Sequence, residues 1–125
     1  MIALGNRRLW LCGEPVDMRK GIDGLVAVVV QRLQRAVMTG DVFVFVGRDP
    51  SRLKMLCWDH DGYWLVVKRL AAGRFVVPRA LRLDGQPSTI ELTMSEWQLI
   101  LDGIVVRERL VMRRLRPESR AAGMG

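Results

Sequence analysis

The sequence predicts an α+β fold, in which an antiparallel sheet of four to six strands packs against one long and one shorter helix. Three observations indicate this fold: short β-prone runs alternate with turn signals, one long segment carries a helical apolar stripe, and a capping box precedes a second, shorter stripe. The chain has 125 residues, enough for one core. We expect a single domain over residues 1–106 and an Arg-rich tail, partly helical or disordered, over residues 107–125.

The N-terminal third is expected to hold a strand and the main helix. Residues Arg8 to Cys12 are a β-prone run, which Gly13, Glu14 and Pro15 close. Asp17 is the expected N-cap of a helix, and its apolar positions recur every three or four residues. These positions are Met18, Ile22, Leu25, Val26, Val29, Val30, Leu33 and Val37. The valines and two glycines have low helix propensity, so burial has to stabilise this helix.

Residues Val42 to Val46 are apolar at every position. Such a run is typical of a strand that is covered on both faces, so we expect it near the centre of the sheet. A second helix or a symmetric partner chain would supply the second cover.

Two further strands, Arg52 to Trp58 and Tyr63 to Arg69, flank a connector that ends in the hairpin signal Asp61-Gly62. Antiparallel pairs keep a constant sum of residue numbers, which places Trp58 opposite Tyr63 and Arg52 opposite Arg69. Another short strand, Arg74 to Val77, is closed by Pro78.

The two faces of this hairpin differ in composition. One face looks like core and carries Leu53, Met55, Cys57, Trp64 and Val66. The other face carries Trp58, Tyr63, Arg52, Lys54 and Arg69. Aromatic side chains beside cations suit a nucleic-acid platform, because bases stack and phosphates pair with charge. The alternative is a mixed face that another element half covers, with basic residues at its rim.

The C-terminal part is expected to contain a loop from Arg79 to Ser88 and a short edge strand from Thr89 to Leu92. Thr93 and Glu96 form a capping box that begins a second helix. Trp97, Ile100 and Leu101 form its apolar stripe, and Gly103 ends it.

The charge balance is strongly basic. The chain has 20 Lys and Arg against 13 Asp and Glu, which gives a net charge of +7 and a pI near 10.7. Of the basic residues 17 are arginine, whose planar fork pairs with phosphate in a bidentate way. This composition favours a nucleic-acid partner. A GC-rich genome and a well-solvated surface would give the same arginine content.

Arg19 and Lys20 fall in the expected first turn of the main helix, where positive charge opposes the helix dipole. Two cations beside a helix N-terminus would suit a phosphate. Asp17 acting as an ordinary N-cap explains much of the same sequence without a ligand.

No catalytic constellation is evident, and we expect no enzymatic activity, cofactor or metal. Asp59, His60 and Asp61 could bind a divalent ion, but adjacent hairpin residues point apart and tight turns select Asp and Gly. Cys12 and Cys57 lack zinc-site spacing and are expected to be buried, reduced thiols. The longest apolar run is far shorter than a membrane span. We therefore expect a cytoplasmic protein with no membrane partner.

Three stretches of the sequence carry a family resemblance. They are Asp17 to Leu25 (DMRKGIDGL), Val44 to Arg48 (VFVGR) and the block from Arg52 to Pro78, and a weaker match runs from Leu92 to Ile104. In this order they resemble the TnpB-type accessory proteins of the insertion-sequence-66 family of bacterial transposons. The tail after Ile104 departs from the Trp-Arg-Arg-Pro-like ending that is common in the family.

The resemblance implies a non-catalytic accessory role in DNA transposition beside a separate, larger transposase. It implies no likeness to the RNA-guided nucleases that share the TnpB label. We expect the protein to bind transposon DNA, the transposase, or both, and a homo-oligomer is compatible with this role. The alternative is a pure adaptor of the transposase with no DNA contact. The expected nucleic-acid-binding residues are Arg19, Lys20, Arg48, Arg52, Lys54, Trp58, Tyr63, Arg69 and Arg74.

Overall fold

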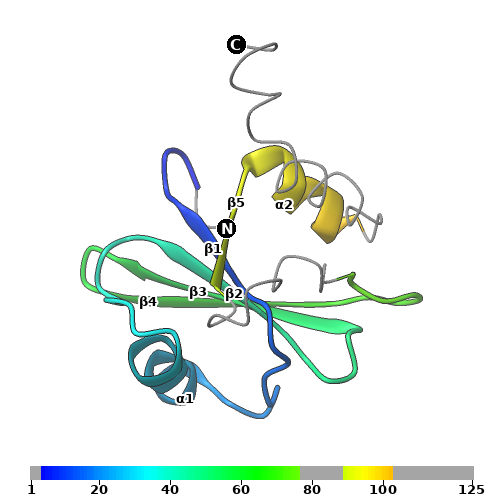
Figure 1. The fold of residues 1–125 in the computed structure, drawn as a ribbon, viewed down its shortest axis with the longest axis horizontal. Coiled ribbons are helices and arrows are strands. Elements are labelled where there is room, and N and C mark those ends of the chain that lie inside the picture. Colours follow the sequence, from blue (N-terminus) through cyan, green and yellow to red (C-terminus); the bar gives the residue numbers. More distant parts are fainter. Residues whose placement is uncertain (1–3, 77–88, 103–125) are drawn as a thin grey trace.

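The computed structural model describes residues 4–76 and 89–102, and it confirms the α+β fold (Figure 1). Its strands are β1 (Leu9–Cys12), β2 (Val42–Val46), β3 (Arg52–Asp59), β4 (Gly62–Arg69) and β5 (Thr89–Leu92). Its helices are α1 (Ile22–Ala27), continued by the π-helical turn η1 (Val28–Arg32), and α2 (Met94–Leu101).

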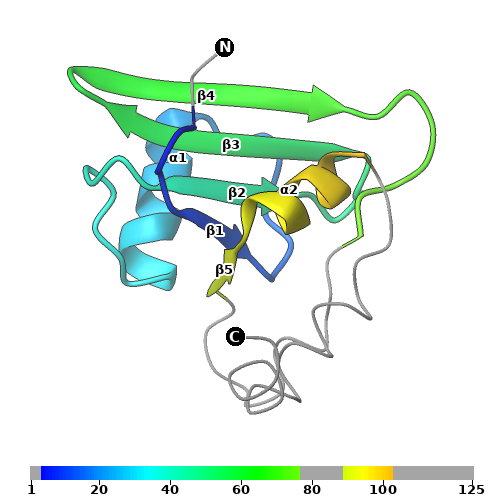
Figure 2. The same cartoon turned by 90° about the horizontal axis from the view of Figure 1, so that it is seen from above.

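The five strands form one sheet in the order β4-β3-β2-β1-β5, which Figure 2 shows from above. All neighbouring pairs are antiparallel except β1 and β2, which are parallel. The sheet is therefore mostly rather than wholly antiparallel. The cause is the connection between β1 and β2, which contains α1 and crosses over one face of the sheet, as a parallel pair requires.

The central strand β2 is buried along its whole length, as predicted. On one face, α1 packs with Phe43, Phe45 and Leu56 in a cluster around Leu25 and Val29. On the opposite face, a second cluster contains Trp97 and Ile100 of α2 together with Phe75. Figure 1 shows the two helices on opposite sides of the sheet. The second cover of β2 therefore comes from within the chain.

The main helix is shorter than predicted. It begins at Ile22 rather than near Met18, and its last turn is a π-turn in which the amide of Leu33 donates to the carbonyl of Val28 (3.0 Å). Three consecutive β-branched valines crowd this turn, which disfavours regular α geometry. Gln34 then adopts φ 55°, a left-handed conformation that ends the helix.

The predicted hairpin register is confirmed, with Trp58 paired to Tyr63, and Arg52 to Arg69. The assignment of Trp64 to the core is wrong, because its side chain is 48% exposed. β4 is an edge strand of the sheet. The side chains on the face that carries Trp64 are therefore less well covered than those of the neighbouring strand β3.

Toward the C-terminus the agreement is partial. The edge strand β5 and the Thr93–Glu96 capping box are confirmed. The predicted strand at Arg74 to Val77 is wrong over its described residues, which form a loop that is bonded to Pro50 and buries Phe75. The expected loop 79–88, the helix stop at Gly103 and the tail 107–125 lie outside the described residues.

Candidate nucleic-acid interface

Six cationic side chains surround one open hollow of about 560 Å³, which we call the basic hollow. They come from the loop before α1, the end of η1, the loop after β2 and the facing ends of β3 and β4. They are Arg19, Lys20, Arg32, Arg48, Arg52 and Arg69. Two acidic residues, Asp17 and Asp49, also line it. The hollow therefore carries a marked excess of positive charge.

The first wall is the loop between β1 and α1. The amide of Val16 donates to the carbonyl of Val46 (3.0 Å), which ties this loop to the end of β2. Farther along, the Lys54 ammonium group donates to the carbonyl of Lys20 (2.8 Å). These two bonds fix the backbone that carries Arg19 and Lys20.

The loop after β2 forms the second wall, and Gly47 allows its close approach to the first. A Cβ atom at Gly47 would lie 2.6 Å from Met18 Cγ and 3.1 Å from the carbonyl oxygen of Asp49. Because Met18 and the Asp49 backbone would both have to move, a side chain at this position would separate the two walls.

The third wall is the end of β4, which contributes Arg69, and the segment that follows β4 continues from it. The amide of Leu70 donates to the carbonyl of Ser51 (2.8 Å), and the amide of Phe75 donates to the carbonyl of Pro50 (2.6 Å). This segment is thus bonded to the loop that carries Arg48.

The charges of the hollow are only partly compensated. Arg52 and Arg69 are direct cross-strand partners and are both exposed, an arrangement of like charges that is mildly unfavourable. Arg32 pairs with Glu14 at 2.8 Å, and Arg19 pairs with Asp17 at 2.9 Å.

The Arg19 side chain and backbone amide both donate to Asp17, and together they lower the pKa of this carboxyl from 3.8 to about 2. A lowered pKa stabilises the fold above the usual value of 3.8, and that contribution is lost as pH falls through about 2. Asp17 therefore stays ionised in the folded protein at neutral pH.

Five of the nine sequence-predicted residues meet in this hollow, namely Arg19, Lys20, Arg48, Arg52 and Arg69. Lys54 lies beside it and anchors the loop. Arg74 lines a neighbouring hollow together with Arg48.

The structure does not place the aromatic pair with these cations. Trp58 and Tyr63 pack edge to face, with ring centroids 5.0 Å apart, at the turn end of the hairpin. Trp58 lies six positions along β3 from Arg52, a distance of roughly 20 Å. Between them Leu56 is fully buried under the α1 cluster. The hairpin face is therefore half covered by another element, with cations at one rim.

The placement of Arg19 and Lys20 in a helical first turn is wrong, as is the role of Asp17 as N-cap. The helix begins at Ile22, and its N-cap, Gly21, has no side-chain cap. Asp17 instead accepts from the backbone amide of Arg19 (2.9 Å), which forms a turn ahead of the helix.

Arg32 is a member of the hollow that the sequence did not reveal. It ends the π-turn, and the periodic pattern of the helix treats it as one more solvated position. Only the tertiary fold, which brings η1 beside the loop before α1, places its guanidinium beside Glu14.

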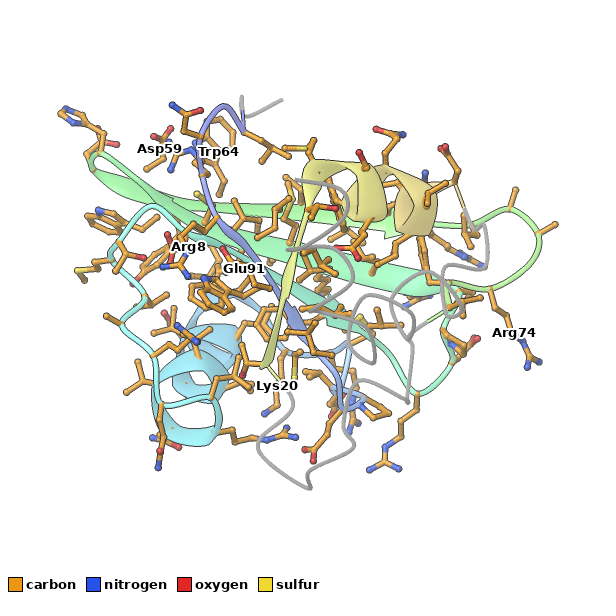
Figure 3. All side chains as sticks on the ribbon, turned by 45° about the horizontal axis from the view of Figure 1, so that its top comes forward. Arg8, Lys20, Asp59, Trp64, Arg74 and Glu91 are labelled. Atoms are coloured by element: carbon orange, nitrogen blue, oxygen red, sulfur yellow. The ribbon has the colours of Figure 1, made fainter. Side chains whose placement is uncertain are left out.

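The sequence alone allows Asp59 to act as a metal ligand, but in the structure its carboxylate is bonded to two other side chains. Arg7 contacts one of its oxygens at 2.7 Å, and the Trp64 indole donates to the other at 2.9 Å. Figure 3 shows Asp59 and Trp64 together at the hairpin turn, far from Arg74. These bonds, with Trp64 contributing most, lower the pKa of Asp59. Over the described residues no group of three His, Cys, Asp or Glu side chains is arranged to hold a metal ion.

Both cysteines are buried, as predicted, and they form no disulfide with each other. Burial raises the pKa of the Cys57 thiol, while the nearby Arg7 opposes that shift. No helix within the described ranges is long and apolar enough to cross a bilayer.

Lys54 is expected to contribute stability through its bond to the Lys20 carbonyl. Replacing it by methionine keeps the apolar stem and removes the charged donor, so the free energy of unfolding should fall by about 1–2 kcal/mol. Urea denaturation measures this change. Arg52→Met, two residues along the same strand face, is the matched control and should change stability by less than about 0.5 kcal/mol. Equal effects of the two substitutions would contradict the anchoring role of Lys54.

The fold and the hollow define a class: an α+β protein with a concave, strongly basic surface at one end of its central sheet. The chain belongs to the family of IS66 Orf2 like proteins, whose family model matches residues 7–110. It is a transposition-associated accessory protein of this family.

Two relatives come from Sinorhizobium fredii. "Uncharacterized protein y4jC" is 34% identical over 97 residues, which cover 78% of this chain and 79% of the relative. "Uncharacterized protein y4hO" is 35% identical over 99 residues, which cover 79% and 82%. No solved structure matches the chain.

Proposed function

We propose that this accessory protein binds the phosphate backbone of DNA in the basic hollow and performs no strand chemistry itself. The observation that carries the proposal is the convergence of six cations from separate segments around one hollow. Arginine forks of this kind pair with phosphate oxygens, and concave basic surfaces concentrate polyanions.

The unfavourable pairing of Arg52 with Arg69 supports an anionic ligand. Two exposed arginines that face each other repel in the unbound protein. A phosphate between them would convert that repulsion into two favourable contacts. Neither side chain has an ion-pair partner among the described residues, so both are available to a ligand.

A pure adaptor is the second candidate, because family members act beside a separate transposase. An acidic surface of the transposase would fit the same hollow without any DNA. Two measurements separate the proposals: DNA affinity of the isolated protein as a function of salt, and capture of the transposase with and without DNA. A DNA ligand requires binding that weakens linearly on a log–log plot as salt rises. An adaptor would capture the transposase while binding no DNA at low salt.

Asp17→Asn should strengthen DNA binding at low salt by about two- to fivefold, because it removes a negative charge from the hollow and releases Arg19. The asparagine oxygen can still accept from the Arg19 amide, so the local turn should persist. Fluorescence anisotropy with a short labelled duplex measures the affinity.

Asp102→Asn provides the charge-matched control for this experiment. Asp102 is exposed at the end of α2 and lines no part of the basic hollow. Its substitution should leave affinity nearly unchanged. If both variants strengthen binding equally, net charge rather than the hollow governs the interaction.

A further inference from the structure

A second hollow of about 330 Å³ adjoins the basic hollow. The two share Pro15 and Arg48 in their linings, so these two residues mark the boundary between them. The second one is mainly apolar, with walls that include Val46, Phe75 and Val76, and we call it the apolar hollow.

The apolar hollow also has a polar rim. Glu14 and Arg74 line it beside Arg48. Arg32 contacts the Glu14 carboxylate at 2.8 Å and so holds it at the boundary between the two hollows. A carboxylate in this position can accept a hydrogen bond from an exocyclic amino group, and the two arginines can pair with flanking phosphates.

We propose that the protein binds DNA through an unpaired nucleotide, with the base in the apolar hollow and the adjoining phosphates in the basic hollow. A duplex offers only its backbone to a concave surface, because its bases stay stacked and paired. A base reaches a separate hollow only when it is unpaired or flipped out. This inference rests on the proposed DNA binding and adds the kind of DNA that is bound.

The size of the apolar hollow and the positions of the two hollows agree with such a ligand. A volume near 330 Å³ lies at the lower end of small-molecule sites, which suits one base. Lys20 and Arg74 lie well apart in Figure 3, so a ligand that reaches both hollows has to be extended. A single strand carries the two groups that suit the two hollows, namely bases for the apolar hollow and regularly spaced anions for the basic hollow.

The test compares two single-stranded oligonucleotides of about eight nucleotides, one of mixed sequence and one with every base replaced by an abasic sugar. Both carry the same phosphates. If a base occupies the apolar hollow, the full chain should bind the base-bearing strand about tenfold more tightly. Equal affinity for the two strands overturns the inference and leaves the proposed backbone binding intact. If neither strand nor a duplex binds at low salt, the proposed function fails as well.

Val76→Trp places a larger side chain in the apolar hollow and should reduce the affinity for the base-bearing strand to that of the abasic strand. Its affinity for duplex DNA should not change. Val67→Trp, on the exposed part of β4, is the matched control and should keep the wild-type difference. A retained difference in Val76→Trp overturns the assignment of the base to this hollow. Tighter binding of an RNA strand of the same sequence overturns the assignment to DNA.

Discussion

Replacing Arg19, Arg48, Arg52 and Arg69 together by glutamine should flatten the salt dependence of duplex binding by about three to four units. Each phosphate contact displaces condensed counterions, which gives a slope of about 0.9 per contact on a log–log plot. All four side chains are exposed on the basic hollow, so the free energy of unfolding should change little. Anisotropy titrations from low to moderate salt measure the slope.

A pair of double variants separates position from net charge. Arg52→Gln with Arg69→Gln removes two charges from the hollow, and Arg8→Gln with Lys68→Gln removes two exposed charges elsewhere. The first pair should flatten the slope by about two units, and the second should leave it unchanged. Equal slopes for the two pairs would contradict the hollow as the binding site.

Truncation after Val106, which removes six arginines, tests whether the tail instead causes the salt dependence of DNA binding.

Trp97→Ala should lower the free energy of unfolding by about 3–5 kcal/mol, because it removes the buried side chain through which α2 packs on the sheet and leaves a cavity there. Met94→Ala on the same helix is the matched control. Met94 is 46% exposed, so its loss should cost much less. Chemical denaturation of both variants measures the difference.

The same experiment tests how β2 is covered. In the structure, α2 and Phe75 cover the second face from within the chain. The midpoint of unfolding should therefore not depend on protein concentration. A midpoint that rises with concentration, together with a small effect of Trp97→Ala, would instead indicate that a partner chain supplies the cover.

Local patterns in the sequence were sufficient for much of the fold. The hairpin register follows from the period of two and the Asp61-Gly62 turn, and the α2 cap follows from Thr93 and Glu96 alone. The uniform burial of Val42–Val46 follows from its unbroken apolar run. Each of these features depends on interactions between residues that are close in sequence or on a single periodicity.

The errors arise where tertiary contacts override local preference. An apolar stripe from Met18 to Val37 predicts one long helix, but valine crowding and the left-handed Gln34 end it early. Val37 nevertheless packs in the same cluster as α1, which explains why the pattern extends past the helix. Trp64 falls at a position that the alternating pattern of its strand assigns to the core. It is exposed because that strand lies at the edge of the sheet.

The candidate site was only partly predictable for the same reason. The cations at the ends of β3 and β4 follow from the hairpin register, whereas Arg32 reaches the hollow through the crossover that contains α1. Separation of the aromatic pair from the cations depends on strand length and on the position of α1 over Leu56. Charge content alone indicates a partner class but gives no position on the surface.

Hydrogen–deuterium exchange of the full chain with and without DNA tests the central claim most directly. We expect DNA to protect the segments that line the basic hollow, residues 15–20 and 48–52 and the backbone around Arg32 and Arg69, while α2 and the hairpin turn around His60 keep their exchange rates. Protection confined to α2 or to the hairpin turn would contradict the account, as would an unchanged exchange pattern at a DNA concentration that saturates binding.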